Sequence, residues 1–423
     1  MPPQGERGAQ TQSRPSTSAI VLAGGEGRRL FPLTRRRCKP AIPFAGRYRL
    51  IDFVLSSLVH SNLTRIHVLT QYESYSLIRH LSRGWGFSAQ LGQYCEVIPP
   101  TPGRGWYLGS ADALYQNLER IGRDRPGIVA VFGADHIYRM DIQQMIREHI
   151  ESEADISISV VPQPIGEAHQ FGCLEVDESM RVRRFLEKPA NPPPFPEDPQ
   201  TALVSMGNYL FNYDVLRRCV EEDHDLPDSR HDIGGDVFPR WYERAHIHAY
   251  NFQHNRIPGA APSDRGYWRD VGTIASYWRS SMDLVSVTPA FNMYNYEWPI
   301  LTTRADNPPA KFVFAERDSN RMGIATDSLV GDGSIISGGH IDRCILGPRV
   351  RINSYASVSE SILFEGVEVG RSCRIRRAII DKHVRIPSDS VIGHDAEDDR
   401  ARGIHVSEDG IVVVPPEAEF RAL

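Results

Sequence analysis

The chain has 423 residues, of which 41% are hydrophobic, and this size with this apolar content predicts two domains with well-formed cores. Its formal net charge of −5 argues against a nucleic-acid polymer as the partner, although arginines crowd residues 28–49 and favour small polyanions. Six scattered cysteines without a Cys-x-x-Cys pair, and no stretch that suits a membrane span, predict a cytoplasmic protein with neither a metal ribbon nor a disulfide framework.

The first predicted segment is a polar tail at residues 1–17. It lacks the apolar core of a signal peptide, so we expect it to be disordered and not to direct secretion. An apolar run at residues 19–23 follows, and it predicts a buried parallel strand.

A glycine-rich turn comes directly after this predicted strand. Its glycines are Gly24, Gly25 and Gly27. Glycines at the carboxyl end of a strand let backbone N–H groups approach an anion, because no side chain stands in the way. Arg29 and Lys39 add positive charge to the same segment. The segment therefore predicts a polyphosphate site.

Two well-known glycine motifs are excluded by the residues that follow. A P-loop needs a Gly-Lys-Ser or Gly-Lys-Thr ending, which is absent here. The dinucleotide-binding fingerprint needs a third glycine where Leu30 stands, so a hydride-transfer enzyme is excluded too. An ordinary turn remains the alternative to a phosphate loop.

From about residue 18 to 290, strand-like and helix-like segments alternate, which predicts a mostly parallel sheet with helices on both faces. The expected strands are residues 65–69, 127–132 and 156–161, and the expected helices are residues 75–81, 111–121 and 142–150. The proline-rich residues 189–199 predict a surface loop.

Acidic residues are the candidates for a metal site. Asp135 follows the apolar run 128–134, so its carboxylate stands at the carboxyl end of a strand, where ligands of such sheets gather. Mg²⁺ favours one or two carboxylates with phosphate oxygens, although an isolated aspartate can also be a turn residue. Asp270 is a second candidate, but spacing alone does not show that the two acids meet. Lys188 either anchors a phosphate or is a solvated surface lysine.

Beyond Pro308 and Pro309 the pattern changes to a short repeat. Between Val350 and Ser390, small and apolar residues recur at steps of five or six, with glycines beside them. This period predicts a hexapeptide-repeat parallel β-helix, whereas the strands of the alternative, a β-sandwich, need longer periods.

Twelve ordered blocks of the chain resemble the sugar-phosphate nucleotidyltransferases, and in particular the bacterial ADP-glucose pyrophosphorylase (glucose-1-phosphate adenylyltransferase) family, over about residues 18–415. The blocks are residues 24–39, 49–53, 70–72, 106–107, 109–113, 135–138, 171–172, 187–192, 205–207, 231–232, 267–273 and 370–374. The fold that the resemblance implies is α/β: a Rossmann-like, mostly parallel sheet in the nucleotidyltransferase domain, followed by a left-handed parallel β-helix.

The resemblance implies a Mg²⁺-dependent enzyme that transfers the adenylyl group of ATP to glucose 1-phosphate, giving ADP-glucose and pyrophosphate for glycogen synthesis. It implies catalytic roles for Asp135, Arg29 and Lys39, and metal binding by Asp135 and Asp270. Implied glucose 1-phosphate contacts are Tyr107, Gly172, Glu187, Lys188 and Ser205. Implied nucleotide contacts are Gly24, Gly25, Gly27, Arg29, Gln71, Gly109 and Asp112.

The resemblance also implies regulation by small phosphorylated effectors. Gln71 and Trp106 match positions that link the allosteric and substrate sites, and Arg36, Arg37, Arg49 and Arg376 match the regions of an effector site between the two domains. It further implies a homotetramer, a catalytic domain at 18–295, a linker at 296–310 and a β-helical regulatory domain at 311–423. The identity of the effectors stays open.

Three other functions compete with this interpretation. A pyrophosphorylase for another base or sugar, such as GDP-mannose, is separable by its nucleotide preference. A silent regulatory subunit would be expected to lose Asp135, Arg29 or Lys39, and all three are present. A nucleic-acid-binding module, suggested only by the arginine cluster, predicts salt-dependent binding to DNA, and we expect none.

Overall fold

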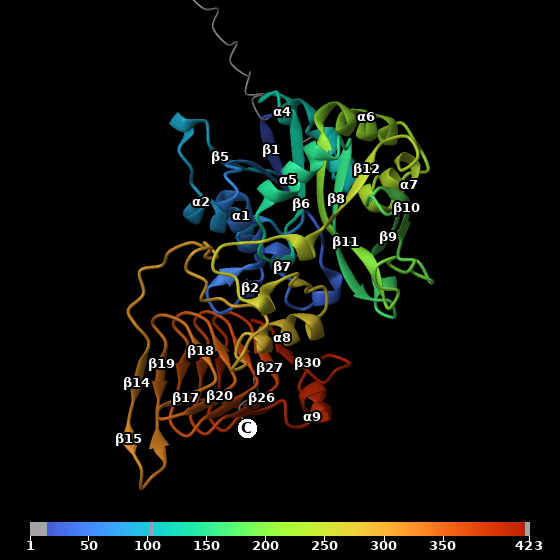
Figure 1. The fold of residues 1–423 in the computed structure, drawn as a ribbon. Helices are drawn as coiled ribbons and strands as arrows, with labels where there is room; N and C mark the ends of the chain where they lie inside the picture. The colour runs from blue at the N-terminus through green and yellow to red at the C-terminus, as the bar shows by residue number, and fades with distance from the viewer. Residues whose placement is uncertain (1–14, 102, 104, 419–423) are drawn as a thin grey trace, which may run out of the picture.

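The computed structural model describes residues 15–101, 103 and 105–418. Residues 1–14 of the expected tail lie outside the described residues. Strand β1 (Thr17–Ala23) begins within the segment that we expected to be disordered, because Thr17 already pairs with Ile128. The chain folds into a sheet domain and a β-helix beside it, with helix α8 at their boundary (Figure 1).

The first domain is built on a nine-stranded sheet among the described residues. Its main order is β10-β9-β11-β6-β1-β4-β5, and β8 joins it to β12. The strands are β1, β4 (Arg65–Thr70), β5 (Tyr94–Ile98), β6 (Ile128–Gly133), β8 (Ile156–Pro164), β9 (Gly172–Val176), β10 (Val182–Glu187), β11 (Thr201–Asn212) and β12 (Ile247–Asn251). The expected strands at 65–69, 127–132 and 156–161 are confirmed within a few residues.

The sheet is mixed. Strands β1, β4, β5 and β6 are parallel, as the alternating pattern predicts. Strand β11 runs antiparallel to β6, β8 and β9, and β9 and β10 form an antiparallel pair. No α-helix lies between β9 and β11: a short turn links β9 to β10, and the proline-rich loop at 189–199 links β10 to β11.

Helices cover both faces of the sheet. They are α1 (Leu50–His60), α2 (Tyr75–Gly84), α3 (Ser110–Gln116), α4 (Leu118–Gly122), α5 (Ile142–Glu151), α6 (Tyr213–His224), α7 (Phe238–Trp241) and α8 (Ile274–Asp283). The single helix expected at 111–121 is wrong: Asn117 divides it, and the Asn117 side chain donates to Ala113 O and to Tyr107 Oη. No helix in the described part of the chain is long and apolar enough to cross a membrane.

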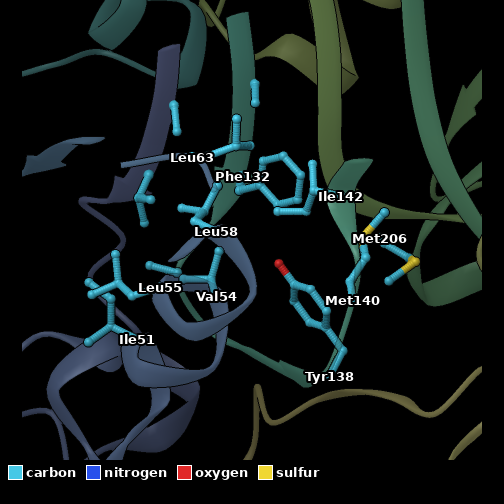
Figure 2. Packing of buried hydrophobic residues seen from close by; sticks show 14 of the residues in the cluster. Ile51, Val54, Leu55, Leu58, Leu63, Phe132, Tyr138, Met140, Ile142 and Met206 are labelled. Atoms are coloured by element: carbon cyan, nitrogen blue, oxygen red, sulfur yellow. The ribbon is translucent and has the colours of Figure 1, made fainter. Parts of the chain in front are cut away.

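Alternate residues of β1 enter different cores. Ala19, Val21 and Ala23 belong to the cluster that α1 covers, whereas Ile20 belongs to the cluster on the opposite face. In Figure 2 the α1 side chains Ile51, Val54, Leu55 and Leu58 point toward the sheet at helical spacing. Tyr138 and Met140, just past the end of β6, close the same cluster (Figure 2). This packing fixes the segment on which Asp135 stands.

Two small antiparallel pairs complete the sheet domain. Strands β2 (Pro43–Phe44) and β3 (Tyr48–Arg49) pair with each other. Strands β7 (His136–Tyr138) and β13 (Trp268–Asp270) form the second pair, in which Asp270 lies opposite His136. The second pair therefore brings two distant parts of the sequence to one edge of the sheet.

The second domain is a parallel β-helix with three strand faces. The first face holds β14 (Lys311–Val313), β19 (Ile335–Ser337), β22 (Arg351–Ile352), β25 (Glu368–Val369) and β28 (Arg385–Ile386). The second holds β17 (Ile324–Thr326), β20 (His340–Asp342), β23 (Ser357–Ser359), β26 (Arg374–Arg376) and β29 (Val391–Ile392). The third holds β18 (Leu329–Val330), β21 (Ile345–Leu346), β24 (Ile362–Leu363), β27 (Ala378–Ile380), β31 (Val412–Val414) and β30 (His405–Val406).

The β-helix confirms the predicted repeat. Ile345, Ile362 and Ile379 stack in register, so one turn takes 17 residues, which matches three steps of five or six residues. A hairpin of β15 (Ala315–Glu316) and β16 (Arg321–Met322) and the helix α9 (Ala396–Ala401) flank the stack (Figure 1).

An apolar core joins the two domains. The β-helix side chains Ile345, Ile362 and Ile379 belong to the same buried cluster as Phe44 and Tyr277 of the sheet domain. Arg37, which is 6% exposed, crosses this boundary and makes a bidentate ion pair with Asp381, with Nη2 2.8 Å and Nη1 3.0 Å from the carboxylate oxygens. The segment between the glycine loop and Lys39 is thus fixed to the β-helix.

Candidate active site

A cavity of about 540 Å³ opens at the carboxyl ends of β1, β4 and β6. Gly24 and Gly25 line it together with Gln71, Tyr107 and Asp135. A second cavity of about 280 Å³ adjoins it and is lined by the rest of the glycine loop, Arg29 and Lys39. Both cavities share Gly25 and Asp135. The predicted phosphate loop and the predicted metal ligand therefore meet where the two cavities join.

The glycine loop depends on Gly27. Its φ is +67°, a left-handed conformation that glycine adopts without strain. A Cβ at this position would lie 3.0 Å from Thr34 Cγ2 and 3.1 Å from Lys39 Cβ. Thr34 Oγ1 also donates to Gly27 O at 3.1 Å. The loop is therefore folded back on the segment that carries Lys39.

Lys39 lies between the two predicted metal ligands. Its Nζ is 2.9 Å from Asp135 Oδ2 and 2.9 Å from Asp270 Oδ1, and the residue is only 7% exposed. The β7–β13 pairing places Asp270 there, because Asp270 is opposite His136, the neighbour of Asp135. Both acids were predicted from the sequence, and in the structure they meet at Lys39, for which a catalytic role was predicted.

The ion pairs hold these groups in their charged forms. Burial would raise the pKa of Asp135, but the charge of Lys39, with His136 beside it, holds that pKa well below its usual range. Burial would lower the pKa of Lys39, but Asp135 and Asp270 together raise it. Around neutral pH Asp135 is therefore a carboxylate and Lys39 an ammonium.

Arg29 is a cation of the site whose guanidinium has no acidic partner among the described residues. It is exposed, lines the smaller cavity and makes no ion pair with any residue that the structure describes. A Cβ on Gly272 would lie 2.9 Å from Arg29 Nη2, so this glycine leaves room for the guanidinium. Arg28 lines the same cavity but pairs with Glu26.

Four of the five predicted sugar-phosphate contacts lie on β9, β10 and β11 or directly after β10. Glu187 lines the larger cavity, and Lys188 Nζ forms an ion pair with it. Gly172 is opposite Glu187 in the β9–β10 pair, where a Cβ would lie 2.6 Å from Phe185 Cζ. Ser205 Oγ accepts from the N–H of Gly207, which lines the cavity.

The side-chain amide of Gln71 makes two hydrogen bonds with the backbone of Tyr107. Gln71 Nε2 donates to Tyr107 O at 3.2 Å, and Tyr107 N–H donates to Gln71 Oε1 at 2.6 Å. Burial raises the pKa of Tyr107, and its hydroxyl accepts from Asn117. Trp106 is 61% exposed and does not line the cavity. Its predicted role in communication stays a prediction.

Gly109 and Asp112 shape the start of α3 beside the cavity. A Cβ on Gly109 would lie 2.2 Å from His231 O, so only glycine allows this close approach. Asp112 does not line the cavity: its carboxylate accepts from Leu108 N–H and Gln116 Nε2 instead. Asp112 therefore supports the loop before α3, and its contact with the nucleotide stays a prediction.

The sequence analysis did not single out several residues that line the larger cavity or lie beside the two acids. Asp232 Oδ2 accepts from Ser110 Oγ at 3.0 Å, and both residues line the larger cavity with Tyr209. His136 Nε2 is 3.7 Å from Asp135 Oδ1 and 4.0 Å from Asp270 Oδ1. Asp232, Ser110 and His136 lie within blocks that carried the family resemblance, so that context was the available signal.

Only one of the four predicted effector residues lines the cavity between the domains. This cavity of about 330 Å³ brings Arg49, Arg79 and Arg83 of the sheet domain together with Arg349 and Lys382 of the β-helix. Burial, with Arg49 nearby, lowers the pKa of Lys382 despite its ion pair with Glu365. The cavity is thus rich in cations that face one another.

The other three predicted effector residues lie elsewhere. Arg37 is buried against Asp381, Arg36 Nε is 2.6 Å from Glu417 Oε1, and Arg376 Nε is 3.3 Å from Glu360 Oε2. Spacing could not reveal that Arg36 and Arg37 are held by acids of the last hundred residues.

Comparison with known proteins agrees with both domains. The Nucleotidyl transferase family model matches residues 18–287, and the model described as GlmU-like, C-terminal hexapeptide matches residues 308–414. The glucose-1-phosphate adenylyltransferase of Anaeromyxobacter sp. (strain Fw109-5) is 51% identical over 400 residues, covering 94% of this chain and 97% of the relative. Those of Bifidobacterium adolescentis and Cutibacterium acnes are 50% and 48% identical over 405 residues, covering 95% of this chain and 97% and 98% of the relatives. With this fold and this identity along nearly its whole length, the chain belongs to the glucose-1-phosphate adenylyltransferase family.

Proposed function

We propose that this chain transfers the adenylyl group of ATP to α-D-glucose 1-phosphate, forming ADP-glucose and pyrophosphate for the synthesis of glycogen. The observation that carries the proposal is the meeting of Lys39, Asp135 and Asp270, with both Lys39 distances at 2.9 Å, beside the glycine loop. The relatives named above carry this activity in their names.

The reaction needs no general base. A phosphate oxygen of glucose 1-phosphate is already an anion, and it attacks the α-phosphorus of ATP in line. The bond from the α-phosphorus to the bridging oxygen breaks, and pyrophosphate leaves with the electron pair. Catalysis then consists of positioning and of neutralising charge. Arg29 and Lys39 are placed to stabilise the pyrophosphate, because both line the cavity of the glycine loop.

We propose Asp135 and Asp270 as the ligands of Mg²⁺. The fit is supported by the hard carboxylate oxygens that converge on one cation, the Lys39 ammonium, and by the small number of protein ligands, which leaves positions for phosphate oxygens and water. When bound, Mg²⁺ supplies positive charge that draws electron density from the reacting phosphates. The chain's own residues orient the substrates around it.

The nucleotide preference tests this function. Pyrophosphate release is measured with Mg²⁺ and glucose 1-phosphate, and ATP is compared with UTP, dTTP and GTP. We expect a clear preference for ATP. Preference for another nucleotide would overturn the adenylyl donor but keep the reaction type, and no release with any nucleotide, even with phosphorylated sugars added, would support a silent regulatory subunit.

Lys188 is expected to hold the phosphate of glucose 1-phosphate. Its ammonium pairs with Glu187 at the cavity, and its side chain is 63% exposed, so it is free to turn to a ligand. Lys188→Ala should raise the KM for glucose 1-phosphate about 10- to 100-fold with a smaller change in the KM for ATP, because one charge-assisted contact is lost. Arg184→Ala is the matched control in steady-state kinetics, because Arg184 lies on β10, the strand that ends just before Lys188, and pairs with Glu175 rather than Glu187. An unchanged KM in Lys188→Ala would refute the assignment.

We further propose that the cavity between the domains binds small phosphorylated effectors. Its arginines, Lys382 and one acid, Glu365, suit a polyanion, and its position between the domains suits regulation. We retain the homotetramer, the catalytic domain at 18–295, the linker at 296–310 and the regulatory β-helix at 311–423 as parts of the same proposal.

Arg49 and Arg376 distinguish this cavity from other arginine-rich surfaces. Activity is measured against a panel of phosphorylated sugars and phosphorylated carboxylic acids. For any activator found, Arg49→Ala should raise the half-activating concentration about tenfold, because Arg49 lines the cavity. Arg376→Ala should leave it unchanged, because Arg376 lies on β26 and pairs with Glu360. The reverse pattern would place the effector site on the β-helix surface.

A further inference from the structure

The Lys39 ammonium occupies the meeting point of the two acids. Its Nζ is 2.9 Å from one oxygen of Asp135 and 2.9 Å from one oxygen of Asp270, and the residue is only 7% exposed. The inference that follows rests on the proposed metal site at these two acids.

The charges around Lys39 do not favour a divalent ion at Asp135 and Asp270 unless an anion binds with it. Two carboxylates and one ammonium leave one negative charge, and His136 Nε2 stands 3.7 and 4.0 Å from the acids. A free divalent ion would reverse the sign of the site and would face the ammonium at short range in a partly buried place. A triphosphate brings enough negative charge for both cations.

The Lys39 ammonium can also reach a second position, in the smaller cavity. It lines the smaller cavity together with Gly25, Gly27 and Arg29, where the phosphates would lie. The Cβ of Lys39 packs against Gly27, at 3.1 Å from where a Cβ of that glycine would be, so the base of the side chain is fixed to the loop. The flexible end of the stem can turn from the acids to a phosphate without a movement of the backbone.

We propose that Lys39 is a resident cation that closes the metal site. In the nucleotide-free protein its ammonium holds Asp135 and Asp270 together and keeps divalent ions out. The triphosphate draws the ammonium away, and the acids become available to a metal only then. Lys39 thus makes metal binding depend on the nucleotide.

The test measures Mn²⁺ binding to the nucleotide-free, full-length protein at one fixed pH, by the loss of the free Mn²⁺ signal in electron paramagnetic resonance. Lys39→Met, which keeps an unbranched side chain one atom shorter and without the charge, should bind Mn²⁺ at least about tenfold tighter than the wild type. Lys39→Gln serves as the second neutral variant if the first does not fold. Adding Asp135→Asn to either variant should abolish the gain.

Arg29→Met is the matched control, because it removes a cation from the same cavity that touches neither acid, and it should change Mn²⁺ affinity less than about twofold. Equal gains in Arg29→Met and Lys39→Met would overturn the inference, because general charge would then explain both. Unchanged or weaker Mn²⁺ binding in the Lys39 variants would also overturn the inference. If that binding still depended on Asp135, the proposed metal site itself would stand. Mn²⁺ binding that ignores both Asp135→Asn and Asp270→Asn would overturn the metal site and the inference together.

Discussion

Asp135→Asn is expected to lower kcat about 10³-fold or more, with little change in the melting temperature. Asparagine keeps the shape of the side chain but removes the negative charge that lies 2.9 Å from Lys39 and that we propose as a metal ligand. The reaction depends on charges placed around the phosphates, so the loss should appear in turnover. The measurement is kcat for ADP-glucose formation at saturating substrates, together with thermal unfolding.

The matched control for this prediction is Asp214→Asn, which removes an exposed carboxylate from α6. It should keep wild-type kcat, because its carboxylate is 83% exposed and its only ion-pair partner in the described structure is Arg217. If Asp135→Asn kept more than about a tenth of the wild-type kcat, a metal held by Asp135 would not be central to the reaction.

The sequence predicted those parts of the site that depend on local pattern. The apolar run before Gly24 and the run before Asp135 each become a buried parallel strand, and the loop after each strand reaches the cavity. The repeat from Val350 to Ser390 is a β-helix because one short period places each inward side chain over the one before it. The predicted fold class is confirmed by the structure and the family models, and the predicted family and enzyme class are confirmed by relatives about 50% identical along nearly the whole chain.

Features that depend on contacts between distant segments could not be predicted. Asp270 reaches Asp135 only through the pairing of β13 with β7, which no spacing reveals. The break in the helix expected at 111–121 has a local cause instead: the Asn117 side chain donates to Ala113 O and to Tyr107 Oη, both earlier in the same stretch of chain.

Arg37→Ala is expected to be among the most destabilising single changes outside the core. The Arg37–Asp381 pair is buried on both sides, with side chains 7% and 3% exposed, and it joins the two domains. Removing the arginine leaves the buried Asp381 carboxylate without its partner, which typically costs about 3–5 kcal/mol. The loss is measured as the change in the free energy of unfolding in urea, or as a lower melting temperature where unfolding is irreversible.

The neighbouring Arg36 provides the control, because it separates the effect of a buried ion pair from that of an exposed one. Arg36 makes a comparable ion pair with Glu417 at 2.6 Å, but its side chain is 62% exposed, so Arg36→Ala should cost less than about 1 kcal/mol. Arg37→Met combined with Asp381→Leu should recover much of the loss, because a buried charge without a partner, rather than the missing attraction, causes most of it. If Arg37→Ala and Arg36→Ala were equally mild, water would have to reach Asp381, and the domain boundary would be looser than the shared core of Ile345, Ile362 and Tyr277 implies.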